Sequence, residues 1–197
     1  MPQSEASLGE KIEVEGAVLY PIFLNLDGKR CVVVGGGEVA NRKARKLLQA
    51  RARVVVISPE VKPELESTAV EVHRRPYKEG DLEGAFLVFA ATDRRTVNAA
   101  VSQEARERGI PVNVADEPSD GDFALPSTLR RGHLQVAVST GGASPTLARR
   151  IRQELEDAFG FEWAGVVEEL SRARRDGRKA EDELEEVVEE CLSRLRG

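Results

Sequence analysis

Cysteine, histidine and aromatic side chains are scarce in this sequence. Among 197 residues there are two cysteines and two histidines, and aromatic residues make up 5% of the chain. Cys31 and Cys191 lie far apart without Cys-x-x-Cys spacing, which argues against a disulfide framework, a thiol redox motif or a zinc site. We expect both to be core thiols. His73 and His133 are also widely separated, so the sequence predicts no metal site.

Long hydrophobic runs and an excess of basic residues are absent as well. No apolar stretch is long enough to cross a bilayer, and the first residues, MPQSEASLGEKIEVEG, lack the apolar core of a signal peptide. We therefore expect a cytoplasmic protein that does not bind membranes. The net charge of −5 argues against nonspecific nucleic-acid binding. Hydrophobic content of 41% beside 32% charged residues is typical of a globular chain.

The most informative segment is a glycine-rich turn between a strand pattern and a helix pattern. It reads CVVVGGGEVANRKARKLL over residues 31–48. The valines predict a buried parallel strand, and apolar residues recur at helical spacing after the turn. Gly35, Gly37 and Ala40 fit the G-x-G-x-x-G/A fingerprint, which allows a tight turn, close approach of a pyrophosphate and close helix packing. The flanks favour a dinucleotide-binding turn over a purely structural one.

Strand and helix patterns alternate after this turn. Further strands are expected over 53–57, 70–74, 86–91 and 111–115, and a helix over 96–108. Such alternation predicts a Rossmann-like parallel sheet, whose ligands bind at the carboxyl ends of the strands. The candidate residues at these ends are Gly35, Gly36, Gly37, Glu38, Val39, Ser58, Pro59, Glu60, Thr92, Asp93, Asn113 and Asp116.

The end of the second expected strand bears on which dinucleotide binds. An acidic residue near this position usually contacts the ribose hydroxyls of NAD, whereas NADP sites usually offer an arginine to the 2′-phosphate. The segment here is Ser58-Pro59-Glu60, with no arginine close by. NAD is therefore favoured as the cofactor. Glu60 is the candidate ribose contact, and a solvated loop residue is its alternative role.

The pattern changes character after residue 115. A turn-rich acidic loop precedes an alternating strand pattern over 133–139, and Ser144 and Pro145 then fit the N-cap and first position of a helix. The loop Thr140-Gly141-Gly142 is either a plain helix start or an anion cradle. Amphipathic helices follow. The expected organisation is a flexible tail at 1–17, a NAD-binding Rossmann domain at 18–115, a small mixed α/β region at 116–150 and a helical region at 151–197.

Several motifs in a fixed order resemble one protein family. They are YPIFL at 20–24, VVVGGGEVANRKARKLL at 32–48, the Ser58-Pro59 pair, FAATDRRTVN at 89–98, NVAD at 113–116, DFALPS at 122–127 and VAVSTGGASPTLARRIRQELE at 136–156. Together they resemble precorrin-2 dehydrogenase, which is also found as the N-terminal part of siroheme synthase. The resemblance runs from about residue 20 to residue 159.

The resemblance implies NAD-dependent oxidation of the tetrapyrrole precorrin-2 to sirohydrochlorin in siroheme biosynthesis. Asp116 matches the family aspartate implicated as general base, and a carboxylate at this strand end suits proton removal beside a hydride acceptor. The family also implies cofactor contacts from the candidate residues at 38–39, 59–60 and 92–93, and a homodimer formed through the region at 116–150. Thr140 matches a position that lines the substrate region. The substrate-binding candidates are Asn113, Ser139, Thr140, Gly141 and Gly142.

Alternatives to a dedicated dehydrogenase stay open. Some family members also insert ferrous iron, so a bifunctional dehydrogenase and ferrochelatase is one alternative. A noncatalytic NAD-sensing module would share the glycine turn but would not require the downstream motifs. A general NAD dehydrogenase would ordinarily bring a catalytic histidine, lysine or tyrosine, and none stands out. Asp116 itself, followed by Glu117 and Pro118, has a turn-capping role as its alternative.

Overall fold

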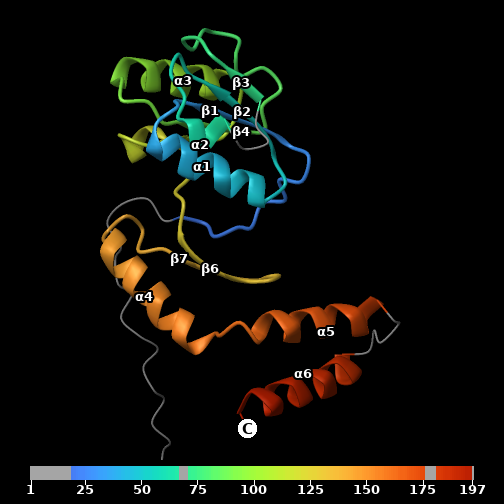
Figure 1. The fold of residues 1–197 in the computed structure, drawn as a ribbon. Coiled ribbons are helices and arrows are strands. Elements are labelled where there is room, and N and C mark those ends of the chain that lie inside the picture. Colours follow the sequence, from blue (N-terminus) through green and yellow to red (C-terminus); the bar gives the residue numbers. More distant parts are fainter. Residues whose placement is uncertain (1–18, 67–70, 176–180, 197) are drawn as a thin grey trace, which may run out of the picture. The chain divides into compact units, whose positions relative to one another are not determined.

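The computed structural model describes residues 19–66, 71–175 and 181–196 (Figure 1). One compact unit is Tyr20–Ala124, and the other comprises Leu19 and the described residues after Ala124. The tail predicted at 1–17 lies outside the described residues. The elements are β1 (Arg30–Val34), α1 (Glu38–Gln49), β2 (Arg53–Ile57), α2 (Pro63–Glu66), β3 (Glu71–His73), β4 (Leu87–Ala90), α3 (Arg95–Glu107), β5 (Val112–Val114), the 3-10 helix η1 (Pro118–Asp120), β6 (Ser127–Arg131), β7 (Leu134–Val138), α4 (Pro145–Ala158), α5 (Trp163–Arg175) and α6 (Glu181–Arg196).

The first unit is built on a parallel sheet of five strands in the order β3-β2-β1-β4-β5. Its central strands are buried on both faces, which explains why they appear in the sequence as continuous valine runs rather than as an alternation. Side chains of β1 alternate between the faces: Cys31 and Val33 lie in one buried cluster, and Val32 and Val34 in the other. The predicted Rossmann-like sheet is confirmed.

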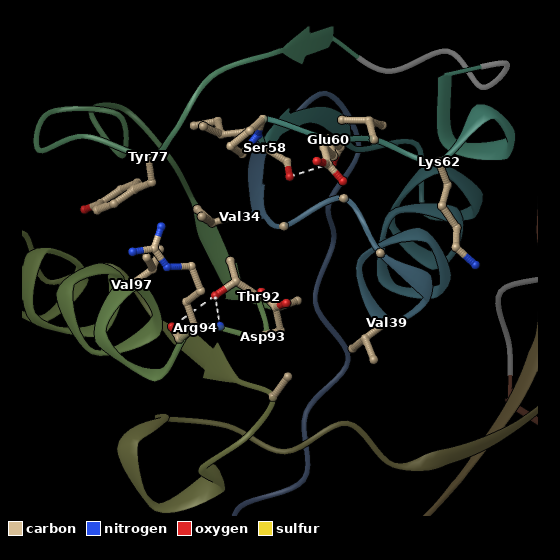
Figure 2. Close-up of a pocket in the computed structure, with 18 of the residues that line it drawn as sticks. Val34, Val39, Ser58, Glu60, Lys62, Tyr77, Thr92, Asp93, Arg94 and Val97 are labelled. Atoms are coloured by element: carbon tan, nitrogen blue, oxygen red, sulfur yellow. Dashed lines mark hydrogen bonds between the residues drawn. The ribbon is translucent and has the colours of Figure 1, made fainter.

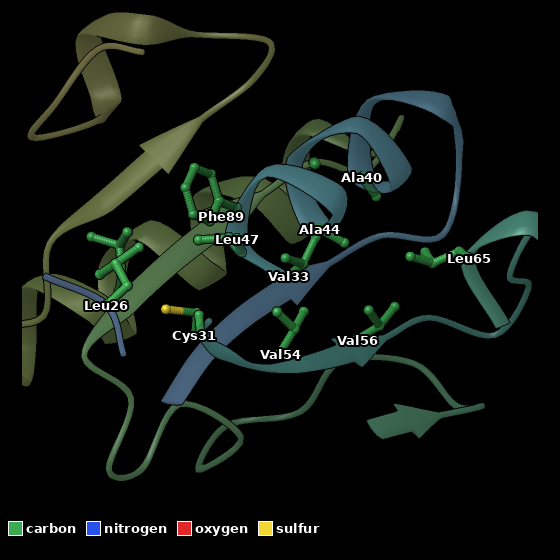
Figure 3. Packing of buried hydrophobic residues seen from close by; sticks show 13 residues of the cluster. Leu26, Cys31, Val33, Ala40, Ala44, Leu47, Val54, Val56, Leu65 and Phe89 are labelled. Atoms are coloured by element: carbon green, nitrogen blue, oxygen red, sulfur yellow. The ribbon is translucent and has the colours of Figure 1, made fainter. Parts of the chain in front are cut away.

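Helices cover both faces of this sheet. Ala40, Ala44 and Leu47 of α1, together with Leu65 of α2, pack on one face (Figure 3). Helix α3 covers the other face through buried residues such as Val101. All five of these side chains are at most 4% exposed. The free thiol of Cys31 is fully buried in the first of these clusters, as predicted. The side chain of Cys191 is outside the described residues.

The strand register aligns the carboxyl ends that form the site. Val34 at the end of β1 is the partner of both Ile57 and Ala90, and Ala90 in turn pairs with Val114. The ladder continues one step beyond the strands, since the backbone N–H of Ala115 donates to the carbonyl of Ala90 at 2.9 Å. The loops after β1, β2, β4 and β5 therefore start from one edge of the sheet.

A buried lysine ties α1 to the last strand of the sheet. Lys43 is 9% exposed, and its Nζ donates to Asn113 Oδ1 at 2.6 Å. The same ammonium lies 5.0 Å from the centroid of the Phe89 ring. Burial lowers the pKa of Lys43 to about 8, and repulsion from Arg42 and Lys46 acts in the same direction. The folded chain is therefore penalised for keeping this proton at neutral pH.

We expect the stability contribution of Lys43 to rise with pH between about 8 and 10.5. In this window the folded chain has released the proton while the unfolded chain, with the ordinary lysine pKa of 10.5, still holds it. Stability increases wherever the unfolded state binds more protons. Relative to Lys43→Met, the free energy of unfolding of the wild type should gain roughly 2 kcal/mol between pH 7 and pH 9.5 in urea titrations.

The Lys43→Met reference is needed because another buried group works in the opposite direction. Burial raises the pKa of the Cys31 thiol to about 11, so that group loses stability as the pH rises above its ordinary value of 9.0. Its contribution cancels in the difference between the two proteins. Wild-type and Lys43→Met curves that stay parallel from pH 7 to pH 9.5 would contradict the assignment of a depressed pKa to Lys43.

The second unit contains an antiparallel hairpin and three helices. Strands β6 and β7 pair through a turn at Gly132, whose φ is 57°. Ser144 caps α4, since its Oγ accepts from the backbone N–H of Leu147 at 3.1 Å, and Pro145 is the first helical residue, both as predicted. Helices α5 and α6 pack through Val166 and Val187. No helix within the described ranges is both long and apolar enough to cross a membrane.

One arginine anchors the other end of α4. Arg131 of β6 donates from Nε to the carbonyl of Phe159 at 2.8 Å and from its second terminal nitrogen to the carbonyl of Glu156 at 3.2 Å. Its guanidinium also lies 4.5 Å from the centroid of the Phe161 ring. A cation that donates to the last carbonyls of a helix satisfies unpaired acceptors and complements the helix dipole. Arg131 therefore fixes α4 to the hairpin.

Candidate functional site

An open pocket of about 950 Å³ lies at the carboxyl ends of the parallel strands (Figure 2). Small-molecule sites typically enclose roughly 300–1,000 Å³. Every residue predicted to contact the cofactor lines this pocket, and so does Asp116. These residues are Gly35, Gly36, Gly37, Glu38, Val39, Ser58, Pro59, Glu60, Thr92, Asp93 and Asp116. The sheet topology thus brings together groups from four separate stretches of sequence.

The three glycine positions of the turn differ in what a side chain would meet there. Gly35 has a φ of 126°, a conformation that side chains disfavour, and a Cβ there would collide with the carbonyl of Ala91. A Cβ on Gly36 would collide with the carbonyl of Glu60. Gly37 differs from both, because a Cβ there would meet no protein atom within 4 Å. A ligand can therefore approach the backbone of Gly37 closely from this open side.

The start of α1 presents donors suited to an anion. The backbone N–H of Asn41 donates to the carbonyl of Gly37 at 3.0 Å. By helix geometry, the N–H groups of Glu38, Val39 and Ala40 have no intrahelical acceptor. Such groups and the helix dipole attract phosphates. With the open side of Gly37, these donors fit the pyrophosphate of a dinucleotide.

Lys62 balances the one acidic side chain at this helix start. Its Nζ lies 2.9 Å from Glu38 Oε2, and both groups line the pocket. The hydrogen bond and the opposite charge lower the pKa of Glu38 and raise that of Lys62. The pair is solvent-exposed, so it offsets charge rather than adding much stability. Repulsion between Glu38 and a bound phosphate is thereby reduced.

The loop after β2 is held against the glycine turn. The backbone N–H of Lys62 donates to the carbonyl of Gly36 at 3.1 Å, and Ser58 Oγ donates to the carbonyl of Glu60 at 2.7 Å. Figure 2 shows Ser58 and Glu60 beside this turn, with their hydrogen bond dashed. Glu60 is exposed and lines the pocket. In Rossmann folds an acidic residue near the end of this strand usually contacts the ribose.

Sequence reasoning missed several residues of the opposite wall. Tyr77, Arg94 and Val97 line the pocket there, and Figure 2 shows Arg94 extending its guanidinium on the side of Tyr77. The Tyr77 hydroxyl hydrogen-bonds to Glu104 of α3, and burial together with that carboxylate raises the pKa of Tyr77. Arg94 directly follows Asp93 and could have been included on that ground. No sequence signal pointed to Tyr77.

Asp116 follows β5 and is held from α3. Its Oδ1 accepts from Asn98 Nδ2 at 2.8 Å, and its Oδ2 lies 3.8 Å from Arg95. Arg95 also binds Asp120 Oδ2 at 2.6 Å. The Asp116 side chain is 35% exposed, so it keeps access to the pocket it lines. A carboxylate in this position can accept a proton from a bound molecule.

The predicted substrate residues do not line this pocket. Asn113 is buried; its amide accepts from Lys43 and donates to the carbonyl of Phe123 at 2.9 Å. The loop Ser139–Gly142 belongs to the second compact unit. There Thr140 Oγ1 accepts from the backbone N–H of Ser144 at 3.0 Å, which orders the turn before α4. A substrate role for these residues stays a prediction.

Few side chains in the described part of the chain are candidates for binding a metal ion. Within the described part of the chain, no three His, Cys, Asp or Glu side chains gather closely enough to hold a metal ion. The imidazole Nε2 of His73 lies 2.7 Å from Glu71 Oε1 at the outer strand of the sheet. His133 lies in the hairpin turn of the second unit and is exposed.

Two family profiles match most of the chain. The profile described as "Putative NAD(P)-binding" matches residues 22–127, and that described as "Sirohaem biosynthesis protein central" matches residues 131–158. The first covers the parallel sheet and the pocket, and so supports a nicotinamide cofactor there. The second covers the end of β6, β7 and α4.

Similar proteins include siroheme synthases and a solved structure. Siroheme synthase 1 of Aeromonas salmonicida is 49% identical over 140 residues, which are 69% of this chain and 30% of that protein. Siroheme synthase 2 of the same organism is 40% identical over 89% of this chain and 36% of its own length. The chain thus spans about a third of these relatives. The structure of SirC, a precorrin-2 dehydrogenase, has a TM-score of 0.72 and 30% identity, covering 87% of this chain and 88% of that one.

Proposed function

Because this chain belongs to the family of precorrin-2 dehydrogenases and siroheme synthases, we propose that it oxidises precorrin-2 to sirohydrochlorin with a nicotinamide cofactor, in the route to siroheme. One observation carries the proposal: Asp116 and the glycine turn line the same pocket. Oxidation of a reduced macrocycle requires a hydride acceptor and a route for proton loss. The pocket offers a place for each.

The chain's own residues have separate tasks in this reaction. Bound nicotinamide supplies the acceptor for two electrons and one proton, transferred as hydride. The N–H groups at the start of α1 would hold the pyrophosphate of the cofactor, and the open side of Gly37 would leave room for it. The Asp116 carboxylate accepts the second proton that precorrin-2 loses. Removal of two electrons and two protons is then complete.

We propose NAD rather than NADP as the cofactor. The loop after β2 places an exposed carboxylate, Glu60, on the pocket wall where a ribose is expected. A 2′-phosphate near this carboxylate would be repelled. The nearby Lys62 is paired with Glu38, which limits its ability to neutralise such a phosphate.

Glu60→Gln is expected to weaken the preference for NAD over NADP. Removing the negative charge lessens the repulsion of the 2′-phosphate while keeping the size of the side chain. The ratio of kcat/KM for NAD to that for NADP should fall about tenfold, which corresponds to ~1.4 kcal/mol. Glu79→Gln is the matched control, because Glu79 is exposed and is not part of the pocket lining. An unchanged ratio in Glu60→Gln would exclude Glu60 from the ribose site.

The proposed reaction can be tested with the purified chain. Anaerobic incubation with precorrin-2 and NAD should produce NADH and the spectrum of sirohydrochlorin in equal amounts. Parallel incubation with NADP tests the cofactor. Addition of ferrous iron afterwards distinguishes a dedicated dehydrogenase, which leaves sirohydrochlorin unchanged, from a bifunctional enzyme, which converts it to siroheme. NAD binding without turnover would instead support a sensing module.

We further propose a homodimer formed through the region at 116–150. The exposed apolar residues there and just beyond support it: Leu125 is 45% exposed, and Leu147 and Ile151 on α4 are 51% and 38% exposed. Light scattering should give twice the chain mass of 21.6 kDa for a dimer and the chain mass itself for a monomer.

A further inference from the structure

Asn98 uses every hydrogen-bonding group of its side chain, and all of its partners belong to the site. It lies on α3 and is fully buried. Its Oδ1 accepts from the backbone N–H of Thr92 at 3.1 Å and from Thr92 Oγ1 at 2.7 Å. Its Nδ2 donates to the carbonyl of Thr92 at 3.0 Å and to Asp116 Oδ1 at 2.8 Å. An amide has two donor hydrogens and an oxygen with two lone pairs, so this set is complete.

The contacts with Thr92 fix which end of the amide faces Asp116. The backbone N–H of Thr92 only donates and its carbonyl only accepts, so the reversed orientation of the Asn98 amide would lose both bonds. The donor end must therefore point to the carboxylate of Asp116. A hydrogen bond from a fixed, buried donor to a charged acceptor constrains the acceptor strongly.

The other partner of Asp116 is less constraining. Arg95 lies 3.8 Å from Asp116 Oδ2, but its side chain is 52% exposed and it makes a shorter contact, 2.6 Å, with Asp120. An exposed, shared guanidinium holds a carboxylate loosely. Asn98 is thus the rigid support for Oδ1 of Asp116, and Oδ2 lies on the side of the exposed Arg95.

We propose that Asn98 is a positioning residue: it sets the orientation of the Asp116 carboxylate and holds that carboxylate at a fixed position relative to Thr92 and Asp93 in the cofactor pocket. The inference rests on the proposed role of Asp116 as proton acceptor. Thr92 and Asp93 follow β4 and Asp116 follows β5, so the amide joins two of the loops that line the pocket. Proton acceptor and cofactor loop are thereby kept in one geometry.

The first test is a double-mutant cycle between Asn98→Leu and Asp116→Asn. Leucine has a shape similar to asparagine but makes no hydrogen bonds. We expect Asn98→Leu to lower kcat for precorrin-2 oxidation at least tenfold in the wild-type background and less than about twofold in the Asp116→Asn background. Equal losses in both backgrounds would show a merely structural role and overturn the proposal. Full activity of Asp116→Asn alone would overturn the proposed base, and this inference with it.

A second variant, Asn98→Asp, tests the proposal independently in case Asn98→Leu does not fold. Asn98→Asp keeps the shape and an acceptor for Thr92, but it places a second carboxyl group against Asp116, and two such groups share a proton. The acid limb of the pH dependence of kcat should move to higher pH by about one unit or more. Arg95 of α3, which faces Asp116, and Asp120 of η1, which binds Arg95, are unchanged in this variant. An unmoved acid limb would overturn the proposal.

Discussion

Asp116→Asn is expected to lower kcat for precorrin-2 oxidation by about 10²- to 10⁴-fold, the contribution typical of a positioned general base. Asparagine has the size of aspartate, and its Oδ1 can still accept from Asn98 Nδ2, so the local structure should persist. What the variant loses is the carboxylate that we propose as the proton acceptor. The affinity for NAD, measured by calorimetry without precorrin-2, should therefore change little.

The matched control for this variant is Asp27→Asn. Asp27 is exposed and does not line the pocket, so the same chemical change there should leave kcat unaltered. Single-turnover measurements of NADH absorbance separate the chemical step from product release. If Asp116→Asn oxidised precorrin-2 at the wild-type rate, proton loss would have to use another group or solvent, and Asp116 would be left with a role in the structure of its loop.

Gly36→Ala is expected to lower the stability of the protein, whereas Gly37→Ala is expected to weaken the binding of NAD. A Cβ at Gly36 would collide with the backbone of Glu60, so the loop after β2 must move and the protein should lose roughly 1–3 kcal/mol of stability. A Cβ at Gly37 meets no protein atom, and its φ of −85° suits alanine. Gly37→Ala should therefore melt like the wild type. Its methyl group occupies the space for the pyrophosphate, so the Kd for NAD should rise at least about tenfold.

The two measurements needed are a thermal melt and calorimetric titration with NAD. Gly165→Ala is a suitable control, since Gly165 lies in α5, a Cβ there would meet no protein atom within 4 Å, and it is not among the residues that line the pocket. It should retain the wild-type Kd. Undiminished NAD binding by Gly37→Ala would mean that the cofactor does not pass over the glycine turn, and the binding site would have to be sought elsewhere along the strand ends.

Much of the first unit is predictable because burial on both faces leaves a strong pattern. The valine runs at 32–34 and 54–56 permit little besides central strands, and both are strands. The helix expected at 96–108 is α3, displaced by one residue. The secondary structure of the second unit is harder to predict from the sequence. Strand β6 has the sequence STLRR, in which only Leu129 is buried, so its apolar pattern was too weak to predict it.

The site was predictable as far as topology determines it. Parallel strands bring their carboxyl ends to one edge, so residues 35–39, 58–60, 92–93 and 116 could be assigned without coordinates, and all line the pocket. Asn98 was missed, although it shares the buried stripe of α3 with Val101 and Ala105. A polar residue on an apolar helix face should have been a signal, because its burial requires partners. Those partners became visible only with the fold.

The strand order also has a consequence for how the chain is made. Central strand β1 is synthesised before the other four strands of this sheet, but its neighbours in the sheet are β2 and β4. On the ribosome, one edge of β1 stays open until β2, α2 and β3 have already emerged, and non-local parallel pairing forms slowly. A valine-rich edge exposed for that time is a target for chaperones and a source of aggregation. Asp116 emerges after all five strands of this sheet, so the nascent chain completes the glycine turn well before it acquires the proposed proton acceptor.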